Sequence, residues 1–403
     1  MFLKDYFSQN EKLSLLESFC SSLVVGLAET YFIAYALHLG VSVIQSGLLS
    51  SLPLLVAGFS PFIFRKVFHK FVNSTWVLVA CLIQASAVAL LALMGAFSFN
   101  HTSTFSFYFL LFLFTLYWFG NFTALPSWNK WISELIPHAK SERYFTARSR
   151  MIQIGTLVGL FVGGFSLHLK LLNISTTTLF VMLFLLAYHF KILAFYFLYK
   201  QPSAISHYDL SWQRASHFFK RHLGFFSVYS VFNISLFLSS PFVAGYLISI
   251  RGLNYVDYMW VMAAFFSGKI ITTMFLDQMK KNWTPHQMYF FGGLMAAPLP
   301  AFWPFCDTVF LLCLLHLISG IGWAAWEVGM SLAIFKKINS HEKIEAVTIY
   351  NMIGLPTQVL GTVFGAILLK FAYNESYTAM FVVAGIARFI LVLPLYFQKF
   401  GEN

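Results

Sequence analysis

The sequence predicts an all-α protein that crosses a membrane many times. Of its 403 residues, 59% are hydrophobic and only 10% are charged, and the mean hydropathy is +0.72. A soluble globular protein does not need so apolar a composition, which is typical of an integral membrane protein. Apolar stretches of about 20 residues, the length that spans a bilayer as a helix, also recur along the whole chain.

Twelve apolar segments are long enough to span the bilayer, and a polar stretch divides them into two sets of six. The first set covers residues 13–37, 45–64, 74–97, 105–127, 149–169 and 175–199. The second set covers residues 222–248, 255–277, 285–304, 308–335, 345–369 and 376–398. We therefore expect an N-terminal six-helix bundle in residues 1–199 and a C-terminal one in residues 222–403. A cytoplasmic linker, residues 200–221, would join them.

The positions of the basic residues predict the orientation of the chain. Its net charge of +11 would suit a nucleic-acid partner if the charges formed one surface. With the N-terminus inside, however, only Lys170, Arg251 and Lys370 of the 26 Lys and Arg residues fall on the outer side. This asymmetry is the positive-inside signal, so both termini are expected in the cytoplasm and no nucleic-acid partner is implied.

Small residues repeat in two of the predicted helices. The fifth segment contains "GTLVGLFVGG", with Gly155, Gly159, Gly163 and Gly164, and the eleventh contains "GTVFGA", with Gly361 and Gly365. A spacing of four residues places glycines on one helix face, where another helix can approach closely. We expect a helix-packing seam in each half, and a functional interpretation adds that these seams move.

The loop after the fourth segment carries an unusual motif, "SWNKWISELIPHAKSERYFTARSR", from Ser127 to Arg150. The loop after the tenth segment, "SLAIFKKINSHEKIEAV", has the same layout about 200 residues later, with little identity. Twelve segments, a six-plus-six division, a long inner linker and weak half-repeats resemble the major facilitator superfamily across essentially the whole chain.

Two local motifs carry the resemblance further. "GTLVGLFVGG" is similar to a fifth-helix pattern of that superfamily, G-x-x-x-G-P-x-x-G-G, which is associated with antiporters; Leu160 stands in place of the proline. The Ser127 to Arg150 motif is similar to W-x-x-W-x-x-D/E-L-V-P-x-x-x-R-G-R-Y/F-F-x-x-R of a bacterial branch, from which Ser141 and Glu142 depart. The matching residues are Trp128, Trp131, Glu134, Pro137, Arg143, Tyr144, Phe145 and Arg148.

The resemblance implies a secondary transporter that works by alternating access. Its substrate would bind near the bilayer midplane between the halves, and rigid-body rocking would expose it to either side. The first, fourth, seventh and tenth helices would line the cavity with the second, fifth, eighth and eleventh.

Glu29 is the most informative residue, because it places a carboxylate inside the first apolar segment. At 1.5 Å per residue it lies roughly 17 Å into the membrane, near the midplane. A charge there is costly and must face a cavity or a partner. Because burial favours the neutral acid, Glu29 could bind and release a proton or contact a cationic substrate. The alternative is a structural hydrogen bond or ion pair. Tyr31, beside it, is a candidate for the cavity wall.

Glu327, in the tenth segment, is the second intramembrane acid, and Trp323 lies four residues before it on the same helix face. With Trp326, these residues would suit an organic cationic or amphipathic substrate through stacking or cation–π contact. Packing is the alternative for the two tryptophans.

The remaining polar residues in the segments have structural alternatives. Lys269 could pair with an acid or bind an anionic group, and Arg388 is expected to form a structural ion pair. Lys191 is expected to extend to the inner surface. Asn233 and Gln358 are weaker candidates for the cavity, with interhelical hydrogen bonds as the alternative.

In the inner loop after the fourth segment, Glu134 could pair with Arg143 or Arg148 and hold the inward side closed. We treat this inner gate as a hypothesis, since surface ion pairs contribute little energy. The alternative is that the arginines only set the topology.

Enzyme chemistry is not expected. The sequence has no G-x-S-x-G nucleophile motif, no phosphate-binding loop ending in Gly-Lys and no H-E-x-x-H zinc motif. The four cysteines lack C-x-x-C spacing, so we predict neither a metal site nor a cofactor.

We therefore expect a monomeric, multi-pass transporter of the inner membrane. The partners are a small organic solute, the lipid bilayer, and a proton or sodium as coupling ion. Proton-coupled export of cationic or amphipathic compounds is favoured; uptake of an anionic metabolite or metal chelate is the alternative. A non-transporting receptor or a lipid-modifying enzyme is more remote.

Overall fold

The chain forms two compact units of helices. The computed structural model describes residues 7–97, 103–136, 138–168, 174–205, 211–275, 278, 282–338, 342–371 and 377–398. The first unit comprises Met1–Val41, Leu52–Asp209 and Asn254–Met259. The second comprises Ser42–Ser51, Leu210–Leu253 and Trp260–Asn403.

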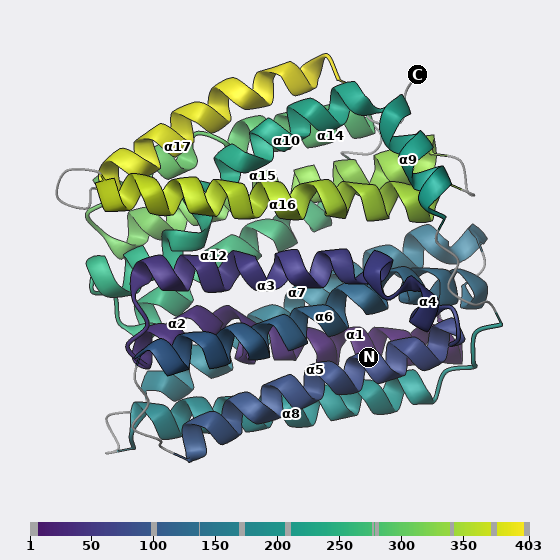
Figure 1. Cartoon of the computed structure of the whole chain (residues 1–403), viewed down its shortest axis with the longest axis horizontal. Coiled ribbons are helices and arrows are strands. Elements are labelled where there is room, and N and C mark those ends of the chain that lie inside the picture. The colour runs from purple at the N-terminus through teal and green to yellow at the C-terminus, as the bar shows by residue number, and fades with distance from the viewer. Residues whose placement is uncertain are drawn as a thin grey trace. The chain divides into compact units, whose positions relative to one another are not determined.

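Long helices supply most of the first unit. The first segment begins with a capping box, in which the Ser8 side chain accepts from the Glu11 backbone N–H and Glu11 accepts from that of Ser8. In Figure 1, α5 and α8 run side by side. The helices are α1 (Gln9–Leu27), α2 (Phe32–His38), α3 (Val43–Ile63, shared with the second unit), α4 (Arg65–Phe68), α5 (Asn73–Ala96), α6 (Ser103–Leu135), α7 (His138–His168) and α8 (Thr176–Tyr199).

The second unit is also helical and includes a short amphipathic helix, α9 (Trp212–Arg221), within the predicted linker. Its first long helix is interrupted: α10 (Leu223–Phe237), a 3-10 turn (Ser240–Phe242), α11 (Val243–Gly245) and a π-helical turn (Tyr246–Ile250). Next come α12 (Tyr255–Met274), whose first residues belong to the first unit, α14 (Pro285–Ala296) and a 3-10 stretch (Leu299–Phe305). The last helices are α15 (Val309–Lys337), α16 (Lys343–Phe371), α17 (Tyr377–Val392) and a 3-10 turn (Leu393–Tyr396).

The described helices lie in the expected apolar segments, but two of these segments are less suited to cross a membrane than the others. Ten stretches of the described chain are long and apolar enough to cross a membrane. Two expected segments fall outside these ten, 255–277, in which Tyr255–Met274 is helical, and 285–304, in which Pro285–Ala296 is an α-helix. Helix α12 carries Asp257 and Lys269, and α14 ends after 12 residues at a proline-rich sequence. Prolines remove the backbone N–H that a continuing helix needs.

The first long helix of each unit is interrupted by a short 3-10 turn. In the first unit, a 3-10 turn of Glu29–Tyr31 separates α1 from α2. In the second, Pro241 lies in the turn that follows α10 and explains the break there. Such breaks leave backbone carbonyls without helical partners, and inside a membrane these must be satisfied within the protein.

Arg388 of α17 satisfies the break in the second unit. Its side chain is buried, with 2% of its surface exposed. It donates to the carbonyl oxygens of Ser235 (3.2 Å) and Leu236 and to the hydroxyl oxygens of Ser239 (2.7 Å) and Ser240 (3.1 Å). The expected ion pair is wrong for the described part of the chain, where these oxygens take the place of a carboxylate.

Glycines bring helices close together in each unit. A Cβ atom at Gly159 of α7 would lie 2.6 Å from the Leu23 carbonyl oxygen and 3.1 Å from the Gly26 Cα of α1. In the second unit, a Cβ at Gly361 of α16 would lie 2.9 Å from the Phe237 Cβ of α10, and one at Gly365 would collide with the Leu238 carbonyl. Both contacts therefore require glycine.

Replacing Arg388 by methionine is expected to destabilise the protein, because it leaves buried carbonyl oxygens unpaired. Each such oxygen costs about 1–3 kcal/mol. Thermal unfolding of the purified protein measures the loss, with Lys370→Met, an exposed cation of the same unit, as control. Equal stability of the two variants would contradict the role assigned to Arg388.

Gly159→Leu is expected to lower stability by about 1–3 kcal/mol, because the new side chain forces α7 away from α1. The same unfolding measurement applies. Val158→Leu is the matched control, since Val158 neighbours Gly159 but is exposed. A Gly159→Leu protein as stable as this control would show that the close approach is not needed.

Candidate functional site

Glu29 lies at the break of the first helix, in the 3-10 turn between α1 and α2. Its side chain is half-buried, and its Oε2 accepts a hydrogen bond of 2.9 Å from the Tyr117 hydroxyl of α6. Thr30 next to it donates to the Val25 carbonyl at 3.0 Å, which satisfies one of the oxygens freed by the break. The acid is therefore held by a neutral phenol, and its negative charge is not met by a contact ion pair with any described residue.

Lys191 of α8 differs from its expected position. We expected it to reach the inner surface, but this is wrong: the residue is only 7% exposed. The Cys81 thiol of α5 donates to the Lys191 backbone carbonyl at 3.8 Å, which ties α5 to α8.

Tyr31 is fully buried in the first unit. Its hydroxyl donates to the Leu160 carbonyl of α7 at 2.8 Å, and its ring would contact a Cβ at Gly163. This tyrosine anchors the helix break against α7. Gly155 and Gly164 lie on the same helix as Gly163.

The second unit brings two predicted residues together. Lys269 of α12 and Glu327 of α15 form an ion pair with an Nζ–Oε1 distance of 2.7 Å, and the ammonium also lies 5.1 Å from the centre of the Phe265 ring. The Lys269 side chain is 13% exposed, whereas 54% of the Glu327 side chain is exposed. The acid is therefore the accessible member of the pair.

Aromatic residues surround the neighbouring turn of α15. Trp326 is buried and packs against Phe232 in a tilted contact and Tyr289 edge-to-face, with ring centroids 5.3 and 5.8 Å away. Its indole N–H donates to the Tyr350 hydroxyl at 3.4 Å. Tyr350 in turn stacks on Tyr229 at 4.7 Å. Trp326 therefore belongs to the packed interior of the unit.

The other three candidates of the second unit differ in their surroundings. Trp323 is only partly buried, with its ring 6.2 Å from that of Trp326. Asn233 is committed to structure, because its amide donates at 2.7 Å both to the Gly354 carbonyl and to the Thr357 hydroxyl. Gln358 is buried on α16.

The motif after the predicted fourth helix forms a cluster at the predicted inner end of the first unit. Arg148 makes an ion pair of 2.8 Å with Glu17 of α1, donates to the Ser14 carbonyl at 2.7 Å and stacks 4.2 Å above the Trp128 ring. The Tyr144 hydroxyl lies 2.5 Å from the Ser14 hydroxyl. Arg148 thus pairs with Glu17, an acid that we did not predict as its partner.

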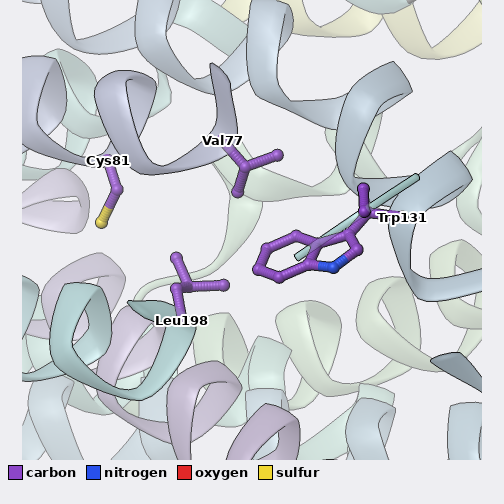
Figure 2. Close-up of a cluster of buried hydrophobic side chains, with 5 residues drawn as sticks. Val77, Cys81, Trp131 and Leu198 are labelled. Atoms are coloured by element: carbon purple, nitrogen blue, oxygen red, sulfur yellow. The ribbon is translucent and has the colours of Figure 1, made fainter. Parts of the chain in front are cut away.

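Other residues of the motif hold the chain that follows α8. Figure 2 shows Trp131 packed with Val77, Cys81 and Leu198 in a buried hydrophobic cluster. The Trp131 indole donates to the Pro202 carbonyl at 2.8 Å.

Glu134 contributes to the same attachment, since its carboxylate accepts from the Ile205 backbone N–H at 3.0 Å. Arg143 lies 4.8 Å from the centre of the Phe7 ring. Pairing of Glu134 with Arg143 as an inner gate stays a prediction. Pro137 lies outside the described residues, as do the side chains of Ser141 and Glu142.

The sequence pattern did not single out Tyr117, Glu17 or Tyr350. With aromatic residues at 19% of the chain, one more tyrosine in an apolar segment carries no signal. Glu17 could have been found, because it lies about two turns inside the first helix with Ser14 and Ser18 nearby, a polar face at the start of an apolar segment.

Arg148→Met is expected to destabilise the protein by about 3–5 kcal/mol, because it leaves Glu17 buried without its partner. Thermal unfolding measures the loss. The double variant Glu17→Gln/Arg148→Met is expected to recover part of it, since no charge then stays buried. A double variant whose loss of stability equals the sum of the losses in Arg148→Met and Glu17→Gln would contradict direct pairing.

Comparisons with known proteins support the fold. No protein-family model matches the chain, and no curated protein matches it. Its structure is similar to the crystal structure of a D-xylose-proton symporter, with a TM-score of 0.71 at 14% identity over 98% of each chain.

Two further solved structures agree. The nucleoside transporter NupG matches with a TM-score of 0.67 at 13% identity, covering 98% of this chain and all of its own. The human organic anion transporter MFSD10 (TETRAN) matches with a TM-score of 0.67 at 10% identity, covering 96% of this chain and all of its own. The chain is a polytopic, all-α membrane protein with the fold of the major facilitator superfamily.

Proposed function

We propose that the protein is a proton-coupled secondary transporter of the inner membrane that moves a small organic solute by alternating access. Export of cationic or amphipathic compounds is the favoured activity, and Glu29 is the residue that binds the proton or the substrate. The protein acts as a monomer and needs no cofactor. The observation that carries this proposal is the half-buried carboxylate at the break of the first membrane helix.

Three features support the role of Glu29. The carboxylate lies deep in an apolar helix, where a permanent unpaired charge is costly. Its hydrogen-bond partner, Tyr117, is neutral, so the acid can take up a proton without leaving a buried cation in contact behind it. The three structurally similar proteins are all transporters, and one of them is a proton symporter.

Glu327 is the second candidate for contact with a cationic substrate. Its carboxylate is the exposed member of the pair with Lys269, and Trp323 offers a partly buried aromatic surface on the same helix. Uptake of an anionic metabolite or chelate is the alternative activity. It would use Lys269, but that side chain is only 13% exposed against 54% for Glu327, so the accessible charge of the pair is the negative one, which favours the cationic substrate.

Reconstitution into liposomes tests the proposal, with the aromatic cation ethidium as the probe. An imposed pH gradient is expected to drive ethidium movement through the wild-type protein, followed by its fluorescence. Glu29→Gln is expected to lower the driven rate at least about tenfold, because the variant keeps the shape of the side chain but cannot exchange a proton.

Glu342→Gln is the matched control, because this acid pairs with Arg221 outside the predicted spans. It is expected to transport like the wild type. Gradient-driven transport by Glu29→Gln at the wild-type rate would show that Glu29 is not needed for proton coupling or for binding of the substrate. Transport of an anionic probe, with none of ethidium, would favour the alternative activity.

A further inference from the structure

We propose that Glu327 and Phe265 form a binding site for a primary ammonium group, and that Lys269 occupies this site until the solute displaces it. The inference rests on the proposed function and narrows its favoured substrate class from organic cations to primary amines with an apolar body. Lys269 then acts as an internal competitor, which lowers the affinity of the site for the solute.

The groups around the Lys269 ammonium are those that an ammonium site requires. The Nζ atom donates to the Glu327 Oε1 at 2.7 Å and lies 5.1 Å from the centre of the Phe265 ring. The carboxylate supplies a charge and a hydrogen-bond acceptor, and the aromatic face supplies cation–π attraction. The same two groups would hold the ammonium of a solute amine, which has the same three N–H donors as lysine.

The carboxylate of this site can be reached from water. Glu327 lies in the stretch Val309–Ala333, which is long and apolar enough to span a membrane, and 54% of its side chain is exposed. Because a charge that faces lipid is costly, the exposed side is expected to face a water-filled space. Lys269 donates to Oε1, and no described residue forms a hydrogen bond to Oε2. A solute ammonium can therefore bind Oε2 before Lys269 leaves Oε1.

Only the side chain of Lys269 has to move in this exchange, because the helices that carry the pair are in close contact. A Cβ atom at Gly320 of α15 would collide with the Phe265 carbonyl of α12, and the Thr272 hydroxyl donates to the Ile321 carbonyl at 3.1 Å. The lysine stem is flexible, so its ammonium can leave without movement of α12. Two ammonium groups at one carboxylate also repel each other, which favours the departure of Lys269 once the solute is bound.

The test measures the affinity of the purified protein in lipid nanodiscs for phenethylammonium, from the concentration dependence of thermal stabilisation. Phenethyl alcohol, which has a similar shape but no charge, corrects for non-specific effects. Glu327→Gln is expected to bind the amine at least about tenfold more weakly than the wild type, because it lacks the charge. Lys269→Met is expected to bind it at least about tenfold more tightly, because the site is then no longer occupied by the lysine.

Lys370→Met is the matched control. This lysine of the second unit also lies near an aromatic ring, 5.8 Å from the centre of that of Phe371, but it is exposed at the end of α16. The control is expected to bind the amine like the wild type. Equal affinities of Lys269→Met and the wild type would overturn the inference, as would wild-type binding that does not depend on Glu327.

A second probe tests the primary amine as the substrate class. Phenethyltrimethylammonium carries the same charge but has no N–H donor, so Lys269→Met is expected to bind it at least about tenfold more weakly than phenethylammonium. Equal affinities for the two probes would overturn the assignment to primary amines.

A variant that does not fold also gives an answer. If Lys269→Met does not fold, Lys269→Gln takes its place with the same expectation, because its amide can still donate to Glu327. If neither variant folds, Lys269 is a structural cation that no solute displaces, and the inference is wrong.

Two patterns of results separate failure of this inference from failure of the proposed function. If Glu29→Gln stops ethidium transport while Lys269→Met binds the amine no more tightly than the wild type, the inference fails and the proposed function stands. If the amine binds as expected but a pH gradient drives neither ethidium nor the amine through the wild type, the proposed function fails and the ammonium site stands.

Discussion

The structure depends on one constraint, that an ionised or polar group inside a membrane helix needs a partner within the protein. Three cations of the helices obey it by direct contact. Arg148 meets Glu17, Lys269 meets Glu327, and Arg388 meets backbone and serine oxygens. Each contact joins different helices of the same unit, so satisfying a charge also fixes how the helices pack.

Glu29 satisfies the constraint less completely. It has a neutral phenol in contact and forms no contact ion pair with a described residue. A contact ion pair is costly to break, by about 3–5 kcal/mol when one partner is lost, which suits a permanent link. A carboxylate held by a hydrogen bond from a neutral hydroxyl loses less interaction energy when it takes a proton. The looser arrangement is therefore the one in which reversible protonation is least costly.

How far the sequence predicts this protein depends on the physical origin of each feature. The helices follow from apolar length, which is a local property, so their presence and approximate positions could be predicted. Their ends could not: α6 continues to Leu135 and α7 begins at His138, because a helix does not stop where the apolar core of the membrane ends. The length of an apolar segment reflects the thickness of the membrane core, whereas capping residues and loop connections determine where each helix ends.

The partners of the polar residues were less predictable, because they depend on which helix faces lie together. Glu327 and Lys269 were both identified, and their ion pair joins residues 58 positions apart. Arg148 was identified as well, but its partner Glu17 was hidden at the start of an apolar segment. Tyr117 gave no signal among so many aromatic residues. The chemistry of a site could be predicted by residue type, but its geometry required the packing.

The two broken helices show why this packing matters for function. In the second unit, the break after α10 is held by Arg388, which donates to oxygens on both sides of the start of the turn. In the first unit, the break between α1 and α2 contains Glu29, a group that changes charge when it binds a proton. In the proposed function, proton binding at Glu29 changes the charge at the break in the first unit, whereas the break in the second unit is held by the hydrogen bonds of Arg388.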